Sequence, residues 1–183
     1  MALGRWHGLL ALAVAFVAGV ALARAEETAA MRWRHGIAMH GEPALPVGYA
    51  HLPYVNPQAP RGGRIVLGQQ GTFDSLNPYV VRGVAPDLVP KYIVQSLLTR
   101  SSDEPFTAYG LLAEAVQMPT NRRWIAFRLD ARAKFSDGTP VSPDDVIFSF
   151  ELLKTKGKPF HRASLARVTE ARAIDQHTVR FDL

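Results

Sequence analysis

A turn, a helix start and a long apolar run follow one another in FSDGTPVSPDDVIFSFELL, from Phe135 to Leu153. The apolar residues from Val146 to Leu153 alternate as in a strand and also recur at helical spacing, so periodicity alone does not separate the two. The preceding Ser142-Pro143-Asp144-Asp145 favours a helix, because a serine N-cap, a proline in the first turn and two carboxylates all suit a helix start. Since most of its surface is apolar, we expect this helix to be largely buried.

Asp144 and Asp145 admit a second interpretation, as an acid/base or metal-binding pair. Adjacent side chains on a helix point about 100° apart, which separates the two carboxylates. Acids are also common near helix starts, where they stabilise the positive end of the helix dipole. The capping interpretation accounts for both residues and is the favoured one.

Two further segments alternate apolar and polar residues. Odd positions from Ile125 to Phe135 are apolar, which predicts a strand with one buried face, and Asp137-Gly138 then turns the chain. His177 to Leu183 alternates in the same way, and Val168 to Ile174 is expected to pair with it across Asp175-Gln176. The sequence ends inside this pattern, so we expect it to be the N-terminal part of a longer protein.

Proline and glycine divide the preceding region. Residues 26–63 are rich in proline and are predicted to form an extended, irregular arm. Arg64 to Gly68 is a short β-branched run between glycines, which predicts a buried strand. Asp74 to Pro78 has turn chemistry, and Asp87 to Leu98 has the apolar spacing of an amphipathic helix.

The first 25 residues have the layout of a secretory signal peptide. Arg5 precedes an apolar run of 14 residues from Leu9 to Leu22, and Ala23-Arg24-Ala25 forms a small-x-small cleavage site. We therefore expect export to the periplasm with cleavage after Ala25. A transmembrane anchor is the alternative, but the run is shorter than the roughly 20 residues that span a bilayer.

Composition excludes several classes of function. The formal net charge is +5, and the basic residues are scattered beside acids, whereas a nucleic-acid protein needs a basic stripe or a recognised motif. With no cysteine there is no disulfide or zinc finger, and the histidines lack metal-helix spacing. Ser75 and Ser149 lack the G-x-S-x-G context of a hydrolase nucleophile. We predict no catalytic residue, no cofactor and no metal.

The order of these segments resembles the bacterial family-5 extracellular solute-binding proteins, the oligopeptide-, dipeptide- and nickel-binding components of ABC importers. The resemblance lies in Ala113-Glu114, Trp124, Phe135-Ser136-Asp137-Gly138-Thr139-Pro140 and Asp145-Val146-Ile147-Phe148-Ser149-Phe150. The arm, with GTFDSLNP after it, resembles the subgroup for oligopeptide and microcin C-type peptides. The implied fold is α/β: residues 64–183 would form an incomplete lobe I of a two-lobed periplasmic binding protein, a mixed sheet with flanking helices, without the second lobe.

The resemblance also implies a function. Such a protein is a monomer and not an enzyme, and it delivers a peptide ligand to an ABC permease in the inner membrane. The positions that match a ligand-pairing segment of the oligopeptide-binding relatives are Arg82, Gly83 and Val84. Gly83 would allow close approach of a ligand backbone. Arg82 stands where those relatives have an acid, and it would favour a carboxylate or phosphate.

Two other hypotheses remain open. The chain could be the start of a secreted hydrolase whose catalytic residues lie beyond Leu183, as the export signal and the mixed α/β pattern allow. It could also be a stand-alone extracellular interaction domain, which requires that residues 26–183 fold alone.

Overall fold

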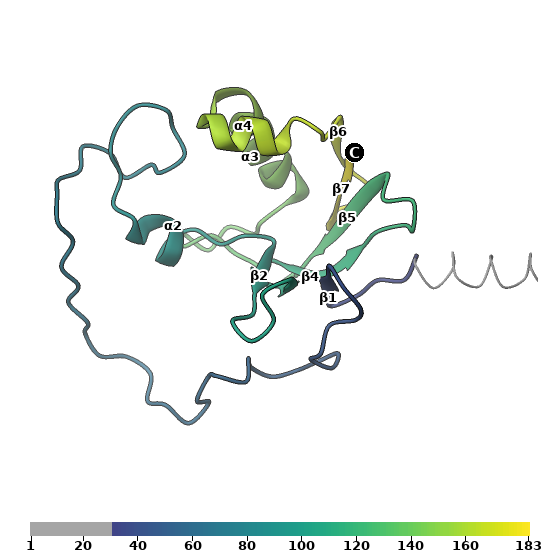
Figure 1. Ribbon diagram of the computed structural model, residues 1–183, viewed down its shortest axis with the longest axis horizontal. Helices are drawn as coiled ribbons and strands as arrows, with labels where there is room; N and C mark the ends of the chain where they lie inside the picture. Colours follow the sequence, from purple (N-terminus) through teal and green to yellow (C-terminus); the bar gives the residue numbers. More distant parts are fainter. Residues whose placement is uncertain (1–30) are drawn as a thin grey trace, which may run out of the picture.

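Two small antiparallel sheets and three helices make up the computed structural model, which describes residues 31–183 (Figure 1). The three-stranded sheet has the order β1 (Gly36–Ala38), β3 (Thr107–Gly110), β2 (Leu98–Arg100). The four-stranded sheet has the order β4 (Ala113–Gln117), β5 (Trp124–Leu129), β7 (Thr178–Asp182), β6 (Glu170–Ala173). The helices are α2 (Leu88–Tyr92), α3 (Pro143–Lys156) and α4 (Pro159–Leu165). The prediction of an α/β fold with flanking helices is confirmed.

The predicted signal peptide and its cleavage site after Ala25 lie outside the described residues. Within residues 31–183, no helix has the length and apolarity that a membrane crossing requires. The chain from β1 to α2 is mainly irregular and runs around the outside of the two sheets (Figure 1).

Helix α3 begins where the sequence predicts it, at a complete capping box. The Asp145 backbone N–H donates to the Ser142 hydroxyl at 3.3 Å, and the Ser142 backbone N–H donates to the Asp145 carboxylate at 2.8 Å. Asp145 therefore serves as a capping residue, and Asp144 lies exposed in the first turn. Pro143 occupies the first helical position, where no backbone N–H is needed.

Removing this cap should cost about 1 kcal/mol of unfolding free energy, because a backbone N–H at the helix start loses its acceptor. We expect Ser142→Ala to show this loss in urea unfolding followed by circular dichroism. Ser149→Ala is the matched control, since Ser149 is exposed within the same helix and alanine is the better helix former. Equal stability of the two variants would show that the capping box contributes nothing.

The main core lies between α3 and the four-stranded sheet. Phe150 of α3 packs with Val179 and Phe181 of β7, and all three side chains are buried. The rings of Phe150 and Phe181 meet edge to face with centroids 5.3 Å apart. Residues of β5 and β6 that share this face of the sheet pack around the cluster.

The expectation that α3 is largely buried is wrong. Phe148 is 67% exposed and Leu152 is 42% exposed, although both belong to the apolar run. Within residues 31–183, α3 packs one face against the sheet and another against α4. The apolar residues outside these contacts face solvent, so the abundance of apolar side chains overstated the burial of the helix.

The strand predicted at Arg64 to Gly68 is also wrong. This segment has no strand structure, and Ile65 and Val66 are about four-fifths exposed, at 81% and 78%. A strand exists only where its backbone groups pair with a neighbour. Among the described residues no strand lies against Arg64 to Gly68, so β-branched composition alone did not produce one.

Two predicted elements are shorter than expected, and one is confirmed. The helix expected to Leu98 ends at Tyr92, and the strand expected to Phe135 ends at Leu129. The strand stops because the Asp130 carboxylate accepts from the Arg132 backbone N–H at 2.8 Å and turns the chain. The predicted pairing at the end of the chain is confirmed: β6 and β7 form an antiparallel hairpin, and Asp175 caps its turn through the His177 N–H.

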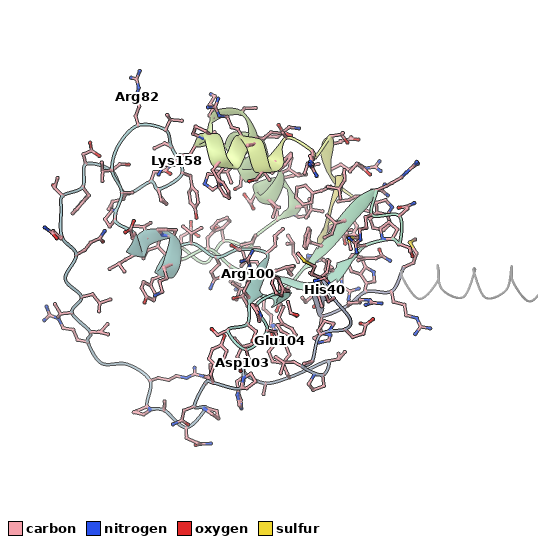
Figure 2. All side chains as sticks on the ribbon, viewed as in Figure 1. His40, Arg82, Arg100, Asp103, Glu104 and Lys158 are labelled. Carbon is pink, nitrogen blue, oxygen red and sulfur yellow. The ribbon has the colours of Figure 1, made fainter. Side chains whose placement is uncertain are left out.

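The N-terminal arm is held against β3 by Glu104 and Tyr109. Tyr109 is fully buried, and its hydroxyl donates to the Glu104 carboxylate and accepts from the Leu45 N–H at 3.1 Å. Glu104 also accepts from the Ala44 N–H at 3.0 Å. Figure 2 shows Glu104 at the turn between β2 and β3, where the arm crosses the sheet.

These hydrogen bonds, that from Tyr109 most strongly, lower the pKa of Glu104 below its ordinary value of 4.5. A lowered pKa in the folded state means that ionised Glu104 stabilises the fold above pH 4.5 and that this contribution is lost as pH falls through the folded pKa. We therefore expect Glu104→Gln to lower the melting temperature at pH 7 and the difference from the parent protein to shrink in acid. The neighbouring Asp103→Asn is the control; a pH-independent difference for Glu104→Gln would contradict the assignment.

Candidate ligand-binding loop

Residues 74 to 84 form a closed loop, here called the 74–84 loop. Its two ends are joined by Asp74, whose carboxylate accepts from the Val84 backbone N–H at 2.6 Å. The Val84 carbonyl in turn accepts from the backbone N–H groups of Asp74 at 3.1 Å and Ser75 at 3.3 Å. One aspartate side chain and two backbone amides therefore define the loop ends.

The first half of the loop is the turn that the sequence predicts. The Ser75 hydroxyl accepts from the Asn77 N–H at 3.0 Å, and the Asn77 side-chain carbonyl accepts from the Tyr79 N–H at 3.0 Å. Each side chain replaces a backbone acceptor two residues along the chain. The hydroxyl of Ser75 therefore serves a turn.

The second half of the loop packs on the connection between α3 and α4. The Lys158 N–H donates to the Tyr79 carbonyl at 3.1 Å, and Val80 forms an isolated antiparallel bridge with Gly157. The Tyr79 ring lies 5.6 Å from the ring of His161 on α4. Partial burial raises the pKa of Tyr79, so its hydroxyl stays protonated at neutral pH. The helix pair thus positions a loop that is itself mostly exposed.

Arg82, Gly83 and Val84, the three predicted ligand-binding residues, lie together at the exposed side of this loop. Arg82 points away from the body of the molecule (Figure 2). Gly83 has a φ of 95°, in the region that favours glycine. A Cβ on Gly83 would lie 2.9 Å from the Ser75 Cβ and 3.2 Å from an Asp74 carboxylate oxygen.

The backbone groups of the three residues are not equally available to a ligand. The N–H and C=O of Val84 are engaged by Asp74 and Ser75. Among residues 31–183, no recorded hydrogen bond occupies the backbone groups of Arg82 or Gly83. Asp74 is the residue that the sequence prediction missed: its turn chemistry is visible in the sequence, but its partner lies ten residues further on.

Gly83→Ala should open the loop, because the new methyl group meets Ser75 in a conformation that alanine disfavours. We expect hydrogen exchange at the Val84 amide to become about tenfold faster, which corresponds to roughly 1.4 kcal/mol. Gly63→Ala is the matched control, since Gly63 has the same φ of 95° and nothing within 4 Å of its Cβ position. Equal exchange at Val84 in the two variants would show that the contact with Ser75 has no role.

A hollow of about 250 Å³ lies between β1 and the connection from β4 to β5. Arg34 and Arg122 both line it, but the Arg34 guanidinium is paired with Glu42 at 2.7 Å. Elsewhere in residues 31–183, no group of three or more metal-ligating side chains comes together. Among the described residues, the 74–84 loop is therefore an exposed backbone loop supported by the connection between α3 and α4.

Comparison with known proteins finds a family match for the second part of the chain. Residues 107–183, from β3 to β7, match the family described as bacterial extracellular solute-binding proteins, family 5 Middle. The matched region includes the turn and helix start at Asp137 to Asp145 on which the sequence resemblance rests.

Curated relatives extend the similarity over most of the chain. The peptidoglycan-binding protein YepA of Agrobacterium fabrum is 50% identical over 154 residues, covering 80% of this chain and 25% of that protein. YejA of the same organism, named as a peptide-binding protein, is 39% identical over 174 residues, covering 94% of this chain and 28% of that protein. The chain thus spans about a quarter of the length of the curated relatives it matches.

The fold matches part of a solved binding protein. NikA from Brucella suis, crystallised with Fe(III)-EDTA, aligns with a TM-score of 0.51 and 19% identity over 59% of this chain and 21% of that chain. The predicted fold class, α/β and a part of a periplasmic binding protein fold, is confirmed. The expected mixed sheet is not seen among residues 31–183, where every strand pairing is antiparallel.

Proposed function

We propose that this chain is part of the substrate-binding component of an ABC importer and that the whole protein binds peptides. The observation that carries the proposal is the match of residues 107–183 to the family-5 solute-binding proteins. The relatives named by function are binding proteins, which favours a receptor over a hydrolase. Export to the periplasm, the monomeric state and delivery to an inner-membrane permease belong to the same proposal.

The names of the two Agrobacterium relatives narrow the ligand class. One is called peptidoglycan-binding and the other peptide-binding, and short peptides are the chemistry that both names share. A peptide released from peptidoglycan is therefore the first ligand to test. Oligopeptides and microcin C-type peptides are the next ligands to test, because the arm resembles the subgroup of binding proteins for these peptides.

The 74–84 loop would contribute main-chain and charge recognition. Arg82 and Gly83 keep backbone donors and acceptors that an extended peptide can pair with. The guanidinium of Arg82 is exposed and suits a ligand carboxylate. We propose that Arg82 binds an acidic group of the peptide, while Val84 closes the loop through Asp74.

Thermal unfolding of the full-length protein with single peptides tests the proposal. A peptidoglycan tripeptide at 100 times its dissociation constant should add about 2.7 kcal/mol of stability. Arg82→Gln should weaken the binding of acidic peptides more than the binding of neutral ones. Arg61 is an exposed arginine of the arm, and Arg61→Gln should leave both affinities unchanged. No stabilisation by any member of a broad peptide library would overturn the proposal, and peptide cleavage during the assay would favour the hydrolase alternative.

A further inference from the structure

Residues 39–55, here called the strap, follow β1 and have no regular secondary structure. The two ends of the strap bind the turn between β2 and β3: the Met39 N–H donates to the Phe106 carbonyl at 3.0 Å, and the Tyr54 hydroxyl accepts from the Ser102 N–H at 3.4 Å. Every residue of the strap is at least partly exposed, and the backbone hydrogen bonds recorded inside it close two local turns. Such a segment is held by its contacts with the body, so it can open while the core stays folded.

The middle of the strap is held by one carboxylate. Glu104 accepts from the Ala44 N–H at 3.0 Å through one oxygen and from the Tyr109 hydroxyl through the other. The Tyr109 hydroxyl in turn accepts from the Leu45 N–H at 3.1 Å, and its buried ring meets the Tyr49 ring with centroids 5.3 Å apart. Burial raises the pKa of both tyrosines, so their hydroxyls stay protonated in neutral and acid solution. Three donors therefore depend, directly or through Tyr109, on the two oxygens of Glu104.

We propose that the strap is an acid-sensitive latch, in which protonation of Glu104 releases residues 39–55 from the β2–β3 turn while the core stays folded. A protonated carboxyl keeps one carbonyl oxygen and turns the other into a hydroxyl, which is a donor. One of the two hydrogen bonds that Glu104 accepts is therefore lost or weakened, and the other no longer ends on a charge. Hydrogen bonds to an ionised acceptor are roughly twice as strong as those between neutral groups.

The pKa of Glu104 is shifted in the direction that such a latch requires. The hydrogen bonds from Tyr109 and from the Ala44 N–H lower it below its ordinary value of 4.5. Ionised Glu104 therefore holds the strap above pH 4.5, and this contribution is lost as the pH falls through the folded pKa. The latch does not rest on the proposed peptide function, because its contacts lie between the strap and the β2–β3 hairpin.

The other charged groups around the latch respond differently to acid. The His35 Nε2 atom lies 2.7 Å from the Leu45 carbonyl, to which it donates, and protonation of the ring leaves this hydrogen bond in place. Glu42 of the strap pairs with Arg34 at 2.7 Å, but Glu42 is 71% exposed, and water screens such a pair. Asp103, next to Glu104 in the chain, is exposed. Variants of Glu42 and Asp103 therefore serve as controls.

Hydrogen exchange of the full-length protein, resolved to single amides and corrected for the intrinsic effect of pH, measures the release. Between about pH 6 and about pH 3 we expect the protection of the Ala44 and Leu45 amides to fall on the order of tenfold. The Phe127 amide, in the middle of the four-stranded sheet, should keep its protection. An equal loss at all three amides would mean global unfolding and would overturn the proposal. Histidine charges between pH 5 and 8, so a release completed above pH 5 would point to His35 and would overturn it too.

Glu104→Gln should release the strap at neutral pH and remove the acid step, since the amide has one oxygen and no charge. Asp103→Asn and Glu42→Gln should both keep the step. If Glu104→Gln also lowers the protection of Phe127, Tyr109→Phe gives the second test: it should expose the Leu45 amide at pH 7 more than the Ala44 amide, because only Leu45 donates to the missing hydroxyl. An acid step that persists in Glu104→Gln, or one that Glu42→Gln abolishes, would contradict the latch.

Discussion

Replacing Phe150 with alanine should lower the unfolding free energy by about 3–5 kcal/mol, the largest single effect we expect in this chain. Phe150 is 6% exposed and is the side chain through which α3 contacts Phe181 of β7. Its removal loses the buried apolar area and leaves a cavity between a helix and a sheet that cannot fully collapse. Urea unfolding, followed by circular dichroism, measures the loss.

Phe148→Ala is the matched control, because it makes the same substitution two residues away in the same helix. Phe148 is 67% exposed, so its removal should change stability by less than about 1 kcal/mol. The comparison isolates burial from helix propensity. Similar losses for the two variants would mean that α3 packs on the sheet through a different face from the one described here.

Gly157→Ala should lower the unfolding free energy by about 1–3 kcal/mol, because the new methyl group has no space. A Cβ on Gly157 would lie 2.4 Å from the Leu153 carbonyl oxygen, which accepts the hydrogen bond that ends α3. The φ of Gly157 is −67°, so the cost comes from the close contact and not from a left-handed backbone. Urea unfolding, followed by circular dichroism, measures this loss as well.

The second consequence of Gly157→Ala concerns the 74–84 loop. Gly157 bridges Val80, and the next residue, Lys158, binds the Tyr79 carbonyl. A shift of Gly157 should therefore loosen the loop and speed hydrogen exchange at Val84, while Gly68→Ala, whose Cβ would meet nothing within 4 Å, should leave both stability and exchange unchanged. A stable Gly157→Ala protein with normal exchange at Val84 would show that the loop does not depend on this connection.

Local chemistry accounts for the elements that the sequence predicted correctly. Ser142 and Asp145 are three residues apart, and Asp175 and His177 are two apart, so each capping partner lies within reach along the chain. The β6–β7 hairpin follows from two alternating segments on either side of this short turn. Such signals depend on neighbours in sequence and need no knowledge of the rest of the fold.

Burial and strand pairing could not be predicted in the same way. The apolar run that contains Phe148 and Leu152 predicts a buried helix, yet only one face of α3 packs against the sheet. Arg64 to Gly68 has the composition of a strand. A strand also requires a neighbouring strand to pair with, and composition does not show whether one is present.

The sequence by itself determined the capped helix, the turns and the final hairpin. Only the tertiary structure decided that Asp74 closes the loop through Val84, that Gly157 supports it, and that Trp33 stacks on Arg128. The physical reason is distance along the chain. These contacts join segments that local periodicity treats as independent, and they form only when the packing of α3 and α4 and the register of the sheet bring the segments together.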